Sequence, residues 1–487
     1  SATSVGAQYY RRATEILDAS GSEFTGPGLT TITGTARSTS GEDFIENVTM
    51  GTYVQEEIGW NDRLFLTGAV RVDNNSAFGS DFDFVTYPKV SGSWVVNEEP
   101  FWNVDWLNTL RVRAAYGQSG QQPETFAALR SFKPVTISAG EGGVTPQFVG
   151  NPDLSPERSS EFEAGFEAGL FDDRFGIDFS FYAQNTKDAI LLRALAPSGG
   201  FPGAQYVNVG ELANRGLELQ LSARLVQRDA VSWDMGFNIS NNESEVLDVG
   251  GAASGVTADG RDYIRMGSNL DTPGIHLRHQ EGLPAGSWFG RKVVSAELNG
   301  DGVAVNVMCA GGDISDVPLP CADAPEVFLG RSDPNVEGSF STTLTLFRGL
   351  TIAGLIDFKQ GVKHGENDTL VRCALFHNCE VNFYPERFDP VFVAQVQSGS
   401  WHDFAVADAS FVKIRDVSVS YMLPEAMSQR FGAAMTRLTV TGRNLKTWTD
   451  WTSLDPETYF LSHQFDKWSQ TFTPHPMSVL FSVNVTY

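Results

Sequence analysis

The chain has 487 residues, with 35 Lys and Arg against 59 Asp and Glu, so its formal charge at pH 7 is −24. So acidic a chain disfavours nucleic acid and other phosphate-rich partners. No stretch offers the roughly 18 consecutive apolar residues of a membrane helix, yet 34 Phe, 12 Tyr and 10 Trp are heavy aromatic use for a chain that is 41% hydrophobic.

Alternation of apolar and polar residues recurs along the chain and predicts β-strands. Successive side chains of a strand point to opposite faces, so each alternating segment would have one apolar and one polar face. The segments with this pattern are 2–11, 64–73, 110–116, 161–170, 175–184, 217–225 and 231–240.

The links between these strands are either very short or very long. Asp172 with Asp173, and residues 227–229, are turns within predicted hairpins. The long links are expected to be loops at 126–150, 195–206, 249–333 and 364–408. Short turns on one side and long loops on the other are typical of outer-membrane barrels.

The last ten residues form the clearest strand of this kind. Val479, Phe481, Val483, Val485 and Tyr487 share one face, and the chain ends on the aromatic ring. A terminal aromatic residue on an apolar face suits the interfacial girdle of a membrane barrel. We therefore interpret Phe481, Val483, Val485 and Tyr487 as the barrel-insertion strand, which the barrel assembly machinery would recognise.

These patterns predict an all-β fold, a transmembrane antiparallel β-barrel of about 14–16 strands. A soluble β-sandwich is the alternative, because its strands can alternate in the same way. Strand length, the loop asymmetry and the terminal aromatic favour the barrel, with the lipid bilayer around it.

The four cysteines form two local pairs in the sequence, Cys309 with Cys321 and Cys373 with Cys379, each inside a long loop. Four cysteines allow three connectivities, and local pairing is the economical one. Two disulfides would require an oxidising compartment, such as the periplasm or the cell surface. Free thiols or a metal site are the alternatives.

Seven sequence blocks follow one another from Tyr53 onward. They include Arg71-Val-Asp73 followed by Ser76-Ala-Phe-Gly79, an N-x-G-x-x-x-N-x-G-x-E run from Asn208, and the segments FVKIRDVSVSYMLP and GRNLKTWTDWTSLDPE. The blocks cover 53–79, 87–102, 110–123, 151–171, 208–221, 411–424 and 442–457. In this order they resemble the barrel of SusC/RagA-like TonB-dependent transporters of the bacterial outer membrane.

The resemblance covers nearly the whole chain but only the carboxyl-terminal part of that family. Its members place a plug and a TonB box before a barrel of 22 strands, and residues 1–487 contain neither. We therefore expect residues 1–487 to be the carboxyl-terminal part of a longer barrel protein. The resemblance implies active import driven through the TonB complex, with a SusD-type lipoprotein as partner.

Long loops on a rigid scaffold commonly carry the binding residues. The aromatic residues that the long loops supply could stack on sugars or peptide side chains, although loop packing or interfacial anchoring is the alternative for each. These candidate substrate-binding residues are Trp288, Phe289, Phe376, Phe383, Tyr384 and Trp401.

Another loop offers oxygen ligands at alternate positions, Glu297, Asn299 and Asp301, followed by Gly302. Such a set suits a hard cation such as Ca²⁺, but the twelfth position of an EF-hand count is Met308. A plain Asn-Gly turn is the alternative. No other cofactor is expected.

No catalytic motif stands out, because H-E-x-x-H, G-x-S-x-G and phosphate-binding loops are absent from the sequence. His276 and His279 form H-x-x-H without a third ligand nearby. The carboxylates on the polar face of 161–170 are expected to pair with arginines or contact the plug rather than to catalyse; the candidates are Glu161, Glu163 and Glu167 with Arg111, Arg113, Arg174 or Arg224.

The sequence therefore predicts a non-enzymatic outer-membrane importer of a nutrient such as an oligosaccharide or a peptide. A passive structural or adhesive barrel in a larger assembly is the alternative. A plug and TonB box encoded upstream would distinguish the two.

Overall fold

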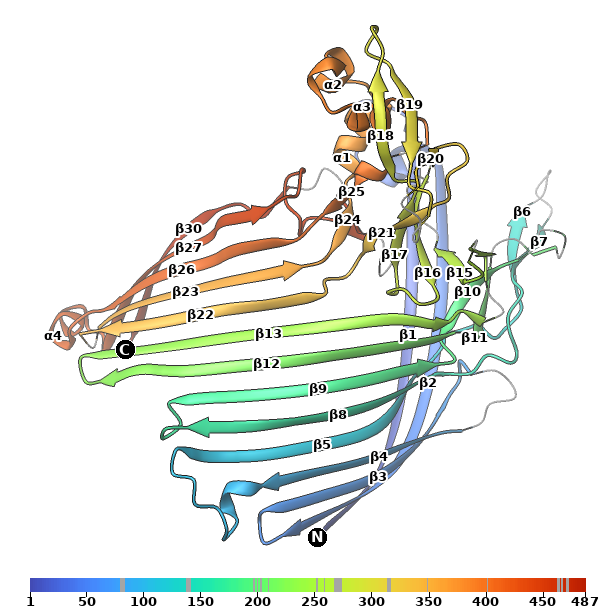
Figure 1. Cartoon of the computed structure of the whole chain (residues 1–487). Coiled ribbons are helices and arrows are strands. Elements are labelled where there is room, and N and C mark those ends of the chain that lie inside the picture. Colours follow the sequence, from blue (N-terminus) through green and yellow to red (C-terminus); the bar gives the residue numbers. More distant parts are fainter. Residues whose placement is uncertain are drawn as a thin grey trace.

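A large curved antiparallel sheet dominates the computed structural model of the chain (Figure 1). The structure describes all residues except 79–83, 137–141, 196–197, 199, 202–203, 209, 251–252, 258, 267–273, 313–316, 348, 401, 462–464, 466 and 470–472. The sheet has 14 strands, within the expected range. In order across the sheet they are β1 (Ala2–Phe24), β2 (Thr35–Trp60), β3 (Leu64–Asn75), β4 (Val85–Val95), β5 (Leu107–Gln121), β8 (Glu157–Leu170), β9 (Phe175–Lys187), β12 (Glu211–Arg228), β13 (Val231–Asp248), β22 (Val336–Leu346), β23 (Leu350–Gln360), β26 (Phe411–Met422), β27 (Met435–Thr449) and β30 (Ser478–Thr486).

The predicted short turns lie together at one end of the sheet (Figure 1). Asn61 and Asp62 between β2 and β3 have φ of 50° and 55°, and Asp172 and Asp173 between β8 and β9 have φ of 59° and 55°. Two consecutive positive φ angles characterise the hairpin turns that match strand twist, and Asn and Asp tolerate this conformation best. The short helices α4 (Glu425–Ser428) and η9 (Gln429–Phe431) connect β26 to β27 at the same end.

The two faces of the sheet differ as the alternation predicts. On the apolar face, Phe166 of β8 and Phe179 of β9 are cross-strand partners whose ring centroids lie 5.6 Å apart. The apolar residues of the terminal strand β30, Phe481, Val483 and Val485, are exposed, as is Tyr487 beyond it. Within the described residues, β30 pairs with β27 and β1 pairs with β2, and each lies at an edge of the sheet.

The polar face is held together by ion pairs that cross more than one strand. Arg113 of β5 lies 2.8 Å from Asp178, 3.2 Å from Glu167 and 3.6 Å from Glu163. Arg111 pairs with Glu167 at 3.6 Å, whereas Arg174 donates to the Leu225 carbonyl oxygen. Glu161 accepts a hydrogen bond from Gln184. The expected pairing with arginine is therefore confirmed for Glu163 and Glu167.

Glycines on the polar face let long side chains reach a strand beyond their neighbour. Tyr182 of β9 pairs with Gly216 of β12, which pairs with Asn242 of β13. The Tyr182 hydroxyl donates to Asn242 Oδ1 at 3.1 Å, so the phenol ring crosses over Gly216. Arg113 reaches Ser180 in the same way, across Gly165.

The long loops fold into what we call the loop module, at the end of the sheet opposite the short turns (Figure 1). It contains a five-stranded, a three-stranded and a four-stranded sheet together with short helices. Its elements are β14 (Gly255–Val256), β15 (Asp262–Met266), β16 (Ile275–Gln280), β17 (Ser287–Gly290), β18 (Val293–Leu298), β19 (Ala304–Cys309), β20 (Leu319–Pro320), β21 (Val327–Arg331), β24 (Lys363–Gly365), α1 (Asn367–Thr369), η6 (Leu370–Leu375), α2 (Glu380–Phe383), η7 (Pro385–Arg387), α3 (Pro390–Gln397), η8 (Asp403–Ala405), β25 (Val406–Asp408), β28 (Phe460–Leu461) and β29 (Lys467–Trp468). In the described part of the chain, every helix is too short or too polar to cross a membrane.

The remaining elements are local. The predicted loop 126–150 contains the hairpin strands β6 (Ser131–Thr136) and β7 (Gly142–Phe148). The predicted loop 195–206 is bordered by a second strand pair, because β10 (Ile190–Ala194) precedes it and β11 (Ala204–Asn208) begins inside it and ends beyond it. Two 3-10 turns, η1 (Ile32–Gly34) and η2 (Val96–Glu98), connect β1 to β2 and follow β4.

The crossing of Gly216 by Tyr182 yields a stability prediction. Gly216→Val should destabilise the fold by about 1–3 kcal/mol, because the added side chain would occupy the space of the phenol ring. Gly68→Val is the matched control, since a Cβ at Gly68 meets nothing within 4 Å. Thermal unfolding in detergent measures both variants, and equal midpoints would contradict the role of Gly216.

Candidate functional site

A group of charges, buried at Lys413 and partly buried at the other members, lies where the sheet meets the loop module and is here called the mouth network. Lys413 Nζ of β26 is 2.7 Å from Asp455 Oδ1 and 2.6 Å from Glu457 Oε2. Arg415 of the same strand is 2.6 Å from Glu457 and 2.7 Å from Asp357 of β23. The network thus joins two sequence blocks, FVKIRD and LDPE, that are 42 residues apart at Lys413 and Asp455.

Local geometry presents both carboxylates of the second block to β26. The Glu457 N–H donates to Asp455 Oδ1 at 2.9 Å, and Thr458 N–H donates to the Asp455 carbonyl oxygen. Such an Asx turn around Pro456 holds two acidic side chains on one side of the loop. The Phe411 ring lies 4.9 Å from Lys413 Nζ, a cation–π contact that adds to the ion pairs.

Contacts of Lys467 and His364 hold the four-stranded sheet β25-β24-β29-β28 beside the network. Lys467 Nζ of β29 donates to the Ser332 carbonyl oxygen at 2.9 Å and pairs with Asp333 at 2.5 Å. His364 of β24 is buried and packs edge-on against Tyr459 at 4.9 Å. Its Nδ1 must donate to the Pro456 carbonyl oxygen at 3.2 Å, because a carbonyl can only accept.

The protonation states in this region follow from burial and neighbouring charge. Burial, together with the charge of Lys467, lowers the pKa of His364 to about 3, so this ring is neutral at physiological pH. Burial would raise the pKa of Glu457, but hydrogen bonds from Arg415 and Lys413 outweigh it and lower that pKa. Glu457 is therefore ionised and matches the two cations.

The network forms one wall of a cavity of about 230 Å³, named here the mouth cavity. Val362, Ala409 and Phe411 supply apolar surface. Its polar lining consists of Lys359, His364, Arg415, Glu457, Tyr459, Lys467 and His475.

Two of the predicted substrate-binding residues are instead part of the loop-module core. Trp288 is 0% exposed, packs edge-on against Trp468 at 5.2 Å and donates from Nε1 to the Lys363 carbonyl oxygen. Phe289 is 1% exposed and covers the guanidinium of Arg278. Both rings lie between strands of the loop module, so the structure assigns them to loop packing and not to cargo contact.

The remaining aromatic candidates are distributed differently. Phe376, 69% exposed, and Phe383 and Tyr384 lie around α2, at the tip of the loop module. The Arg387 guanidinium lies 4.3 Å from the Tyr384 ring centroid. Cargo contact by Phe376 and Tyr384 stays a prediction, and Trp401 lies outside the described residues.

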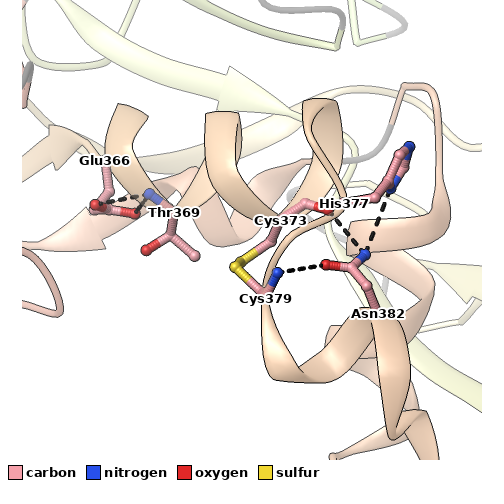
Figure 2. Close-up of a disulfide and its surroundings, with 6 residues drawn as sticks. All are labelled: Glu366, Thr369, Cys373, His377, Cys379 and Asn382. Carbon is pink, nitrogen blue, oxygen red and sulfur yellow. Dashed lines mark hydrogen bonds between the residues drawn. A yellow bond between two sulfur atoms is a disulfide. The ribbon is translucent and has the colours of Figure 1, made fainter.

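A disulfide fixes the tip that carries these rings (Figure 2). Cys373 is bonded to Cys379, and Asn382 accepts from the Cys379 N–H at 3.0 Å while donating to the Cys373 carbonyl oxygen at 2.9 Å. The other disulfide joins Cys309 to Cys321 within β18-β19-β20. Both are the local pairings that the sequence favoured.

Of the candidate cation ligands, Glu297 lies in β18, and Asn299 and Asp301 lie in the turn between β18 and β19. Asn299 Oδ1 accepts from the N–H groups of Asp301 and Val303 at 3.0 and 2.9 Å, and Glu297 accepts from Asn306. These bonds are those of an Asn-Gly hairpin turn. The described residues contain no group of three or more His, Cys, Asp or Glu placed to hold a metal ion, so Ca²⁺ binding stays a prediction.

The histidines of the H-x-x-H motif point to separate partners. His276 Nε2 accepts from Arg278 Nε at 2.7 Å, and His279 Nδ1 accepts from the Gly286 N–H. Burial and the charges of Arg278 and Arg265 lower the pKa of His276 to about 3. Each ring thus stabilises the five-stranded sheet.

Sequence reasoning found the blocks that contain Lys413, Arg415 and Glu457 but not their contacts. It gave no role to His364 or Lys467. These two residues lie 103 positions apart, and only the parallel pairing of β24 with β29 brings them to one cavity. No local sequence pattern in β24 or β29 predicts that pairing.

The mouth network yields a second prediction. Lys413→Met should destabilise the protein by about 3–5 kcal/mol, because the partly buried carboxylates of Asp455 and Glu457 would lose the buried cation that they share. Lys187→Met removes an exposed partner of Glu211 and should cost less than about 1 kcal/mol. Thermal unfolding, with limited proteolysis of residues 450–461, compares the two variants. Equal stability of both would contradict the network.

Asp403 carries a third prediction. Burial raises its pKa to about 6 from 3.8, although Gln395 donates to it at 2.8 Å. Because the folded-state pKa is above the unfolded value, stability from this group is full below about pH 4 and declines as pH rises through 6. Asp403→Asn should therefore flatten the pH dependence of the unfolding midpoint between pH 4 and 7.

The exposed Asp323 provides the control for that experiment. Asp323→Asn should leave the wild-type pH profile in place. If the unfolding midpoint of Asp403→Asn varied with pH in parallel with that of the wild type, burial of this carboxylate would not be the cause of the decline in stability as pH rises.

Comparison with known proteins agrees with the barrel architecture. The sequence model of the family described as "TonB dependent receptor-like, beta-barrel" matches residues 1–281. TonB-dependent receptor P26 of Formosa agariphila is 25% identical over 460 residues, covering 88% of this chain and 45% of that protein. TonB-dependent receptor SusC of Bacteroides thetaiotaomicron is 23% identical over 416 residues, covering 81% of this chain and 40% of that protein.

Among solved structures, the RagAB peptide transporter superimposes with a TM-score of 0.80 at 20% identity, covering 99% of this chain and 52% of that chain. The chain thus spans about half the length of the relatives that it matches. The family match, the fourteen-stranded sheet and the SusC-like blocks lead to one conclusion. The chain belongs to the TonB-dependent receptor-like β-barrel family of the outer membrane.

Proposed function

We propose that this chain forms barrel wall and loops of an active importer, which takes up a nutrient such as an oligosaccharide or a peptide. The observation that carries the proposal is the polar face of the large curved sheet, which extends from the loop module to the short-turn end. Arg113 on this face pairs with Glu163, Glu167 and Asp178 across strands, so the wall presents a hydrated surface on which these charges are compensated.

Transport without covalent chemistry fits the residues of this wall. Arg113 with its carboxylates and the mouth network are ion pairs that hold strands and loops together. In the whole protein, a plug would close the wall and the TonB complex would open it. The loops would capture cargo first, because binding segments on a rigid scaffold are the general arrangement.

The partners follow from the same proposal. A SusD-type lipoprotein would act with the loop module, and exposed Phe376, Phe383 and Tyr384 offer the aromatic surface that protein contacts favour. The barrel assembly machinery would insert the protein through β30, whose apolar face ends at Tyr487.

Growth and uptake by a strain lacking the full-length gene test the importer. We expect lost uptake of one class of oligosaccharide or peptide, restored by the intact gene but not by one without its TonB box. Copurification of a lipoprotein with the tagged importer tests the partner. Unchanged growth and uptake on every cargo tried would refute import and favour a passive structural or adhesive barrel.

A further inference from the structure

The two disulfides of the loop module lie in its tip, which comprises β18, β19 and β20 together with residues 370–397 (Figures 1 and 2). An outer-membrane barrel has its short turns in the periplasm and its long loops outside, so the tip belongs to the cell surface. The proteins that keep bacterial disulfides oxidised work in the periplasm. The place where these two bonds finally lie therefore differs from the compartment in which disulfides are made.

Packing hides three of the four cysteine side chains. Cys309 and Cys321 are 0% and 1% exposed, and Cys373 is 4% exposed, whereas Cys379 is partly exposed. In thiol–disulfide exchange one sulfur attacks another directly, so the rate depends on access to both sulfur atoms. A protein oxidant could not bring its own sulfur against the three buried side chains once the tip has packed. The bonds must therefore form while these segments are still open.

Short separations in the sequence make such early closure possible. Cys309 and Cys321 are 12 residues apart, and Cys373 and Cys379 are 6 residues apart. The entropic cost of joining two ends of a flexible segment rises with its length, so both pairs can meet in the unfolded chain. Neither closure requires a strand of the large sheet or a residue from the other loop.

The remaining packing of the tip uses both closed loops. Helix α3 supplies Ala394 to the cluster around Cys309 and Cys321, and it supplies Val393 to the cluster around Cys373. These contacts join segments that are far apart in the sequence, and they exist only in the packed tip. Because a cross-link restricts the unfolded chain, each closed loop lowers the entropic cost of bringing α3 against it.

We propose that a periplasmic protein with a reactive disulfide oxidises both cysteine pairs before the tip packs, so that the tip folds from an already cross-linked chain. One cysteine thiolate attacks the disulfide of the oxidant, which forms a mixed disulfide and releases one oxidant thiolate. The thiolate of the second cysteine then attacks the sulfur of the first, which closes the bond and releases the other oxidant sulfur. Two electrons and two protons pass to the oxidant for each bond, and it leaves as a dithiol.

This inference concerns the maturation of the protein and is independent of its cargo. The full-length protein is pulse-labelled with heavy amino acids in a bacterial host, and its thiols are alkylated at successive times. Unheated gels separate the assembled barrel from chains still in the periplasm, and mass spectrometry reads the alkylated fraction of each cysteine of the tip. We expect the unassembled chains to be oxidised already. In a host without its periplasmic thiol oxidant, they should keep reduced cysteines until cystine is added.

A packing variant separates oxidation from folding of the tip. Val393 is 0% exposed in α3, so Val393→Ala loosens the tip without touching a thiol. If oxidation comes first, the thiols should disappear at the wild-type rate, while protease added to intact cells should cleave α2 and α3 faster. Slower loss of thiols in this variant would mean that packing precedes oxidation, and would overturn the proposal.

Paired substitutions remove one bond at a time, Cys309→Ser with Cys321→Ser, and Cys373→Ser with Cys379→Ser. Because α3 contacts both closed loops, protease should cleave residues 375–397 about tenfold faster in either double variant, whereas barrel assembly should not change. The corresponding alanine pairs are the matched controls, since they remove the same bond without burying a hydroxyl. They should behave as the serine pairs do.

Three results would contradict the proposed order of events. The first is assembled wild-type barrel that still has reduced cysteines in the tip and oxidises them later. The second is unchanged oxidation in the host that lacks the oxidant. The third is wild-type resistance to protease in both double variants. Uptake assays are independent of all three, so the importer function and this maturation step can fail separately.

Discussion

The structure depends on the requirement that backbone N–H and C=O groups crossing hydrocarbon find partners within the protein. The antiparallel ladder from β1 to β30 supplies those partners between neighbouring strands. Because the ladder fixes strand direction, every second side chain faces lipid, and the others must form the inner wall. The contact between the tilted rings of Phe166 and Phe179 on one face, and the pairing of Arg113 with its carboxylates on the other, are two results of that constraint.

The polar side chains of the wall need to be held in place by several contacts each, because an isolated ion pair exposed to water contributes little free energy of stabilisation. Glycines make such contacts possible here, because a residue without a side chain lets a neighbouring side chain cross its strand. Tyr182 reaches Asn242 over Gly216, and Arg113 reaches Ser180 over Gly165. Each contact links three strands, so the polar face is braced independently of the backbone ladder.

The long loops are held in their fold by a core of their own and not by the strand ladder. Beyond the membrane, backbone groups can bond to water, so a long loop requires its own core to stay folded. Trp288, Ile275, Leu277 and Trp468 form such a core, and two disulfides shorten the outermost segments. The mouth network then anchors this core to β23 and β26, which places the cavity at a fixed distance from the wall.

The sequence by itself determined the barrel class, the strands and the short turns, because period-two alternation and Asp-rich turns are local properties of the chain. It also identified the cysteine pairs and the blocks around Lys413 and Glu457. Only the tertiary structure decided that Trp288 and Phe289 are buried, since a loop aromatic has the same local sequence whether it packs inward or outward. The same holds for His364 and Lys467, whose meeting depends on the pairing of β24 with β29 across about a hundred residues. A contact between distant segments produces no periodic pattern in the sequence of either segment. The mouth cavity is formed by such contacts.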